Sequence, residues 1–143
     1  MYKLTVVRER VAGYGAAQYL RTSAAVYEAF RESFERLERE EMRIVLLDNK
    51  HKVLGFNVVS VGSLTTTIVH PREVLKPIVL MNAAAVMLMH NHPSGDPGPS
   101  KEDVEITRRV RELCELIGVR MLDHIVFGDE ERRYFSFSDN GML

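Results

Sequence analysis

Two histidines, His90 and His92, and an aspartate, Asp103, lie in one short segment that also holds three prolines and two glycines. Side chains alternate along an extended chain, so the two histidines should point to the same side, about two residue rises apart. At this spacing both imidazoles can bind a single ion. Asp103 falls in the first turn of the helix predicted next, from which its carboxylate can return to the same place.

Two imidazole nitrogens and one carboxylate oxygen form a ligand set of catalytic zinc, which keeps its fourth position for water. A structural zinc would be expected to bind a further protein ligand in that position. The segment therefore predicts one zinc ion per chain, held by His90, His92 and Asp103, that activates water for hydrolysis. This chemistry also needs a carboxylate that takes a proton from the water and delivers it to the leaving group.

Each of these residues has a simpler interpretation when it is taken alone. Ser100-x-x-Asp103 is also a helix capping box, in which the aspartate only satisfies a free backbone N–H. The two histidines could be solvated residues of a turn rich in proline and glycine. The metal is favoured because four features occur in an order that can converge on one ion: a buried strand, His-x-His-Pro, a rigid loop, and Ser-x-x-Asp at a helix start.

The pattern resembles the JAMM metalloproteases, whose signature is a glutamate followed at a distance by His-x-His-Pro and then Ser-x-x-Asp. The matching residues here are His90, His92, Pro93, Ser100 and Asp103. The sequence is more similar still to the RadC branch of that family, over roughly residues 25 to 138. That similarity rests on Leu47-Asp48-Asn49-Lys50, Val69-His70-Pro71-Arg72-Glu73, the segment from His90 to Asp96, and Leu122-Asp123-His124-Ile125.

The resemblance implies a role for each residue of the signature. His90, His92 and Asp103 would hold zinc, and Ser100 would hydrogen-bond the developing oxyanion as well as cap its helix. The family's glutamate would act as the general base and would lie where the first helix meets the first core strand.

Two neighbouring residues, Glu40 and Glu41, are candidates for this base. RadC-like sequences favour Glu40, because they resemble this chain in having Arg39-Glu40 followed by one variable residue and then an apolar residue, here Met42. The apolar stripe of the first helix would instead extend to Glu41 if the helix continued that far. Either one alone could be a solvated acidic residue.

Hydrophobic periodicity and turn residues predict the elements that must position this site. A helix should begin after Ser23 as N-cap and end near residues 38–41. The other expected elements are a hairpin over 43–48 and 53–61, a strand over 63–69, a helix from Pro71 that Pro77 interrupts or kinks, a strand over 83–89, a helix over 104–117 ended by Gly118, and two strands over 119–127 and 133–138. Residues 1–22 predict no more than an arm or a strand.

This order of elements predicts an α/β (α+β) fold, a mixed β-sheet flanked by helices. The resemblance implies a JAMM/MPN-like arrangement, whose layers are similar to those of cytidine deaminases. The 143 residues are expected to form a single domain, 1–143. A zinc deaminase itself is excluded because it needs a Pro-Cys-x-x-Cys motif, and the one cysteine, Cys114, stands at an apolar position of a helix.

The formal net charge of −1 gives no overall positive field that would attract nucleic acid or acidic lipid. The cluster Arg108-Arg109-x-Arg111 could contact phosphate, but on a helix it more simply faces water. The N-terminus lacks the apolar run of a signal peptide, and no stretch reaches the roughly 20 apolar residues of a membrane helix. The expected compartment is the cytoplasm, with no membrane partner.

Three functions remain. The first is a zinc-dependent hydrolase, a JAMM-type metallopeptidase or isopeptidase acting on a peptide or isopeptide substrate. The second is a DNA-associated metal-dependent nuclease or DNA-repair domain, because RadC-like proteins carry a DNA-repair name, although the charge balance argues against nucleic acid. The third is a non-catalytic module that keeps zinc for structure. An oligomer could form through an edge strand within residues 1–11.

The remaining polar residues are expected to be structural. His124 should be a satisfied group in a strand rather than a metal ligand. His51 and His70 should be exposed, and Asp96 should form a turn, with a small chance of lining the site.

Overall fold

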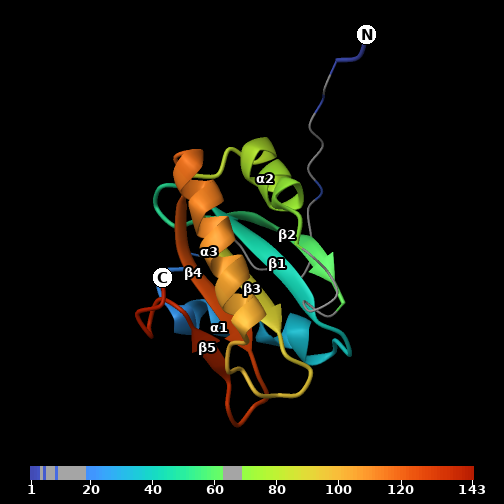
Figure 1. Cartoon of the computed structure of the whole chain (residues 1–143). Coiled ribbons are helices and arrows are strands. Elements are labelled where there is room, and N and C mark those ends of the chain that lie inside the picture. Colours follow the sequence, from blue (N-terminus) through green and yellow to red (C-terminus); the bar gives the residue numbers. More distant parts are fainter. Residues whose placement is uncertain (4, 6–8, 10–18, 63–68) are drawn as a thin grey trace.

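The computed structural model describes residues 1–3, 5, 9, 19–62 and 69–143 (Figure 1). The described chain forms α1 (Ser23–Glu35), β1 (Glu41–Leu47), β2 (Val53–Val61), α2 (Pro71–Leu80), β3 (Ala85–Asn91), α3 (Lys101–Leu116), β4 (Arg120–Phe127) and β5 (Tyr134–Ser136). The strands make one sheet in the order β2-β1-β3-β4-β5. Strands β3 and β4 are parallel and the other neighbours are antiparallel, which confirms the predicted mixed α+β fold.

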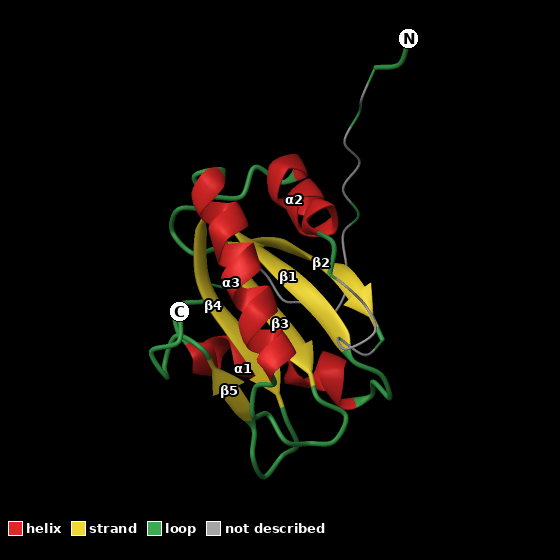
Figure 2. Ribbon diagram, viewed as in Figure 1, coloured by secondary structure: helices red, strands yellow, loops and turns green. Residues whose placement is uncertain are grey.

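The sheet lies between two helical layers, with α1 on one face and α2 and α3 on the other (Figure 2). All seven residues of β3 are buried, as the apolar run without alternation predicts. Met87 and Met89 belong to the core on the α1 side, whereas Val86 and Leu88 belong to the core on the side of α2 and α3. Because side chains alternate, His90 faces the α3 side and Asn91 faces the α1 side.

The first helix is shorter than the sequence predicts. Thr22, not Ser23, is the N-cap, and its hydroxyl accepts a hydrogen bond from the backbone N–H of Ala25. The helix ends at Glu35, several residues before the expected end near 38–41, because Glu41 already belongs to β1. The apolar stripe of α1 therefore does not extend to Glu41.

Two other boundaries differ for physical reasons. Pro77 does not interrupt α2, because it is buried with Val74 and Ile78, and that burial offsets the one backbone hydrogen bond that proline cannot donate. Strand β3 continues beyond the expected residue 89 to Asn91, since His90 and Asn91 pair with β4. Gly118 has a φ of +72° directly after the C-cap of α3, as expected of a glycine that ends a helix.

Two predictions lie mainly outside the described residues. Of the strand expected over 63–69, only Val69 is described, and it is buried outside any strand. The arm or edge strand expected over residues 1–22 falls largely on residues that the structure does not describe.

Candidate metal centre

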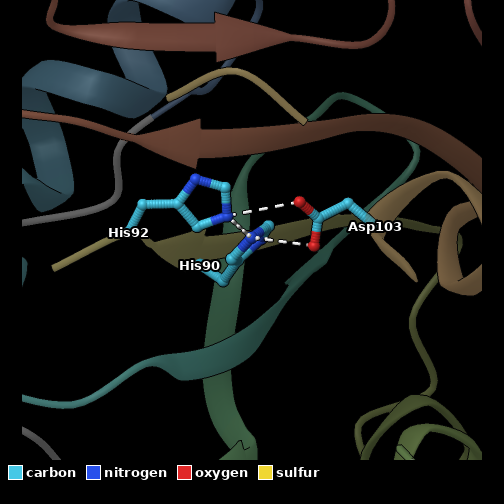
Figure 3. A group of neighbouring side chains, drawn as sticks. All are labelled: His90, His92 and Asp103. Carbon is cyan, nitrogen blue, oxygen red and sulfur yellow. Dashed lines mark hydrogen bonds and ion pairs between the residues drawn. The ribbon is translucent and has the colours of Figure 1, made fainter. Parts of the chain in front are cut away.

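The side chains of His90, His92 and Asp103 point toward one another where β3 ends and α3 begins (Figure 3). The Nε2 atoms of His90 and His92 are 3.0 Å apart. Asp103 Oδ1 lies 3.2 Å from His90 Nε2, and Asp103 Oδ2 lies 3.2 Å from His92 Nε2. One ligand atom from each residue lies within 4.8 Å of the other two, so the three residues could hold a metal ion.

Asp103 combines the two functions that the sequence leaves as alternatives. Its Oδ2 accepts a hydrogen bond from the backbone N–H of Ser100 at 2.8 Å, and Ser100 Oγ accepts one from the N–H of Asp103 at 3.1 Å. This is the predicted capping box. The other oxygen, Oδ1, is buried without a hydrogen-bond partner among the described residues. The cap therefore fixes the carboxylate and leaves one oxygen for a cation.

A buried chain of hydrogen bonds runs behind His90. Thr107 Oγ1 lies 2.6 Å from the carbonyl oxygen of Asp103 and 2.6 Å from His124 Nδ1. His124 Nε2 in turn lies 2.8 Å from His90 Nδ1. His124 also stacks on Phe137, with ring centroids 4.9 Å apart. Both nitrogens of His124 thus have partners, as expected of a structural histidine, and no local sequence signal indicates its contact with His90.

The partners in this chain assign the protons. A carbonyl oxygen only accepts, so the Thr107 hydroxyl donates to Asp103 and accepts from His124 Nδ1–H. Burial keeps the pKa of His124 well below its ordinary value, so its Nε2 carries no proton and accepts from His90 Nδ1–H. His90 Nε2 then presents a lone pair to His92 and Asp103.

His92 is assigned in the same way, because its Nδ1 donates to the carbonyl oxygen of Asp96 at 2.7 Å. In the neutral ring, Nε2 therefore presents a lone pair as well. Two such nitrogens beside a carboxylate repel one another unless a cation lies between them. Neutral imidazoles and a carboxylate are ligands that divalent zinc accepts, so these residues fit the metal.

The pKa values of Asp103 and His92 reflect the close approach of their side chains. Burial alone would raise the pKa of the Asp103 carboxyl, but the adjacent His90 and His92 imidazoles, which stabilise its ionised form, hold that pKa well below its usual range. Burial lowers the pKa of His92, yet its contacts with the Asp103 side chain and the Asp96 carbonyl outweigh this effect and raise it overall. Without a metal, a proton on His92 occupies the position of the cation.

Glu40 and Glu41 point to opposite faces of the sheet. Glu40 Oε1 lies 3.9 Å from His92 Nε2. Glu41 Oε1 instead accepts a hydrogen bond from Arg43 Nε, and the Arg43 guanidinium continues to Ser33 in α1. Of the two candidates for the base, Glu40 is thus the one that lies beside the metal-binding cluster.

Asn91 fixes the backbone around Glu40. Its Oδ1 accepts a hydrogen bond from the N–H of Glu41 at 2.8 Å, and its Nδ2 donates to the carbonyl oxygen of Arg39 at 3.0 Å. This role of Asn91 is not among those that the sequence predicts. The available signal was its place between two histidines of a strand, which turns its side chain to the opposite face.

The loop after β3 packs against the turn between β4 and β5. The N–H of Asp129 donates to the carbonyl oxygen of Gly95 at 2.9 Å, and a Cβ added to Gly128 would lie 2.6 Å from that same oxygen. Asp96 forms the predicted turn, since its Oδ1 accepts from the N–H of Gly98 at 2.9 Å. The loop therefore has little room to shift the carbonyl that orients His92.

The other predictions about single residues have mixed outcomes. Cys114 is buried in the core as expected, and burial raises the pKa of its thiol to about 11. His70 is exposed and caps α2, but His51 is half-buried rather than exposed. Arg108 and Arg111 are exposed and form ion pairs with Glu105, Glu112 and Glu115 of the same helix. Among the described helices, none has the length and hydrophobicity that a membrane crossing needs.

The chain is similar over most of its length to a known family and to curated bacterial proteins. Residues 20–142 match the family of RadC-like JAB domains. A UPF0758 protein of Syntrophotalea carbinolica is 52% identical over 119 residues, which cover 83% of this chain and 52% of the relative. A UPF0758 protein of Geotalea uraniireducens is 44% identical over 135 residues, covering 91% of this chain and 58% of the relative.

The chain thus spans about half the length of the curated relatives that it matches. The family match covers all the elements from α1 to β5, together with the cluster of His90, His92 and Asp103. Because this match extends over residues 20–142, the chain belongs to the RadC-like JAB domain family.

Proposed function

We propose that this chain is a zinc-dependent hydrolase of the JAMM type that cleaves peptide or isopeptide bonds. The observation that carries the proposal is the convergence of the Nε2 atoms of His90 and His92 on the buried carboxylate of Asp103, whose Oδ1 has no hydrogen-bond partner among the described residues. Three protein ligands leave one coordination position for water or substrate. Zinc bound there would polarise a carbonyl group and promote the ionisation of water.

The residues around the centre supply the remaining steps. The Glu40 carboxylate, beside His92, takes a proton from the attacking water and delivers it to the leaving nitrogen. Ser100 Oγ accepts the hydrogen bond of its cap, so its own O–H remains available to donate to the developing oxyanion. Asp103 and Asn91 position these two groups through the backbone of α3 and β1.

The alternative functions have less support. A nuclease would need basic groups that are free to contact phosphate, but two of the three arginines in the α3 cluster, Arg108 and Arg111, are already paired with glutamates of the same helix. A module that keeps zinc only for structure would be expected to fill the fourth position and would not need Glu40 beside the ligands.

Metal content tests the proposal first. Elemental mass spectrometry of the wild type, purified without added metal, should find close to one zinc per chain, and His90→Ala/Asp103→Ala should contain none. The wild type should then cleave members of a panel of fluorogenic peptides and isopeptide-linked peptides. Equally negligible metal in both proteins would rule out the proposed centre, whereas one zinc per chain without cleavage would favour the structural module.

A further inference from the structure

A cavity of about 350 Å³ lies beside the candidate metal centre. It is bordered by the second half of α1, the segment after β3 and the turn between β4 and β5, and His92 forms part of its wall. Nε2 of the same residue lies 3.2 Å from Asp103 Oδ2 in the candidate metal centre. A substrate bound at the centre would therefore have one residue next to this cavity, which we name the His92 pocket.

The walls of the His92 pocket are held by hydrogen bonds and aromatic packing. The N–H of His92 donates to the carbonyl oxygen of Phe127 at 2.9 Å, and the N–H of Asp129 donates to that of Gly95 at 2.9 Å. Phe127 packs against Phe34, with ring centroids 4.6 Å apart. The volume is at the lower end for ligand pockets, which suits a single side chain. The pocket is preformed and has an apolar floor.

The rim of the pocket is acidic. Glu35, Asp129 and Glu130 line it with one cationic residue, Arg31. Arg31 is already paired with Glu35 and with Glu28 outside the pocket. Glu130 is exposed and makes no ion pair with a described residue. Asp129 is paired with Arg132, so Glu130 is the rim carboxylate that an incoming cationic side chain could pair with. An acidic side chain would be repelled by Glu130, and an apolar one would make no ion pair with it.

The chain itself shows how a cation binds to such surroundings. The guanidinium of Arg133 lies 5.0 Å from the ring centroid of Tyr27, which also lines the pocket, and 2.8 Å from a carboxylate oxygen of Glu28. An aromatic ring and a carboxylate together thus hold a cationic side chain at the edge of this pocket.

We propose that the His92 pocket binds the cationic side chain, lysine or arginine, of the substrate residue next to the scissile bond. The alkyl stem packs on the aromatic floor, and the charged end reaches Glu130 at the rim. This inference rests on the proposed hydrolase function for its substrate, and it assigns the substrate class of that same site: peptides with a basic residue beside the cleaved bond.

Binding of small probes to the full chain tests this proposal without any cleavage. Three probes with the same backbone are titrated into the protein and followed by two-dimensional NMR: the amides of Nα-acetyl-lysine, Nα-acetyl-norleucine and Nα-acetyl-glutamate. The lysine probe should bind most tightly and shift the backbone amides of Gly95 and Gly128. Glu130→Gln should weaken it about twofold to fivefold, the effect of losing one exposed ion pair.

Glu131→Gln is the matched control, because it removes the same charge from the next residue of the turn, which does not line the pocket. Unchanged lysine binding in this variant supports a local contact. Norleucine binding as tightly as lysine, no binding of lysine, or equal weakening in both variants would overturn the proposal. These outcomes are independent of zinc, whereas a wild type that binds no zinc would overturn the hydrolase and leave the probe result intact.

Discussion

At the scale of single residues, the candidate centre depends on where each proton lies. Thr107 donates to a backbone carbonyl, so its hydroxyl accepts from His124 Nδ1–H. His124 Nε2 then accepts from His90 Nδ1–H, which leaves Nε2 of the neutral His90 ring without a proton. Such partners behind a metal ligand fix the orientation and tautomer of its ring. The affinity for zinc should therefore depend on a hydroxyl group that never contacts the ion.

Thr107→Val keeps the shape of the side chain and removes this hydroxyl. The buried Nδ1–H of His124 then loses its acceptor, and the affinity for zinc should fall by about 10- to 100-fold. Competition with a fluorescent chelator measures the affinity, and ¹⁵N NMR of the ring nitrogens in metal-free protein shows whether His90 still carries its proton on Nδ1. Thr107→Ser keeps the hydroxyl and should behave like the wild type. Equal zinc affinity in all three proteins would contradict the relay.

The two adjacent glutamates make a second test at this scale. Glu40→Gln should bind zinc and fold normally but lose hydrolysis by about 10²- to 10⁴-fold, because the amide cannot accept a proton. Glu41→Gln should keep hydrolysis and lose only part of the Arg43 pairing on the other face of the sheet. Steady-state kinetics and thermal melting separate the two effects. An active Glu40→Gln with an inactive Glu41→Gln would move the base by one residue.

At the scale of elements, the loop after β3 is held in place by the turn between β4 and β5. This contact sets the carbonyl of Asp96 that orients His92. The approach is so close that the side chain of alanine does not fit at Gly128, where the added carbon would meet backbone and Pro97. Positioning of the metal ligand is therefore shared between two segments that are far apart in the sequence.

Gly128→Ala should separate the loop from the turn and reduce both zinc affinity and melting temperature. Gly118→Ala is a matched control, because its added carbon meets no atom within 4 Å and only its φ of +72° is unfavourable. That variant should lose about 1–2 kcal/mol of stability and keep its zinc affinity. Chelator competition and chemical denaturation measure both quantities. A loss of zinc in both variants would show that general destabilisation, rather than the loop contact, controls the site.

At the scale of the whole molecule, the contribution of His92 to stability should depend on pH in opposite ways with and without zinc. In metal-free protein the raised pKa of His92 stabilises the fold below the ordinary histidine value of about 6.5, and this contribution is lost as pH rises through the folded pKa. The lowered pKa of Asp103 stabilises the fold above the ordinary value of 3.8, and this contribution is lost as pH falls through the folded pKa. Both contributions are fully present between pH 3.8 and pH 6.5, the ordinary pKa values of the two groups.

Zinc requires neutral imidazoles, so its stabilising effect should grow as pH rises. The increase in melting temperature on adding equimolar zinc, relative to EDTA, should be larger at pH 8 than at pH 5.5. Circular dichroism melts across this range measure it. His70→Asn, which replaces an exposed histidine by another helix-capping residue, should leave the profile unchanged. A zinc effect of equal size at every pH would contradict the assignment of His92 as a ligand.

The sequence by itself determined most of the architecture and the composition of the candidate centre. The apolar run before His90 predicts a strand covered on both faces, and the Ser100-x-x-Asp103 pattern predicts a capped helix, because both signals are local and periodic. Alternation in the strand also places His90 and His92 on one side. The end of α1 was predicted less well, since the run of residues after Glu35 is polar and carries no periodic signal.

Only the tertiary structure decided which groups meet. Glu40 and Glu41 differ by one position, and the pairing of β1 with β3 turns the first toward His92 and the second toward Arg43. Thr107, His124 and His90 come from three different elements, and the parallel pairing of β3 with β4 brings the two histidines together. These contacts join residues up to several tens of positions apart, and local propensity contains no information about such distances. Local pattern fixes which side chains share a face, whereas strand register and helix packing fix which faces meet.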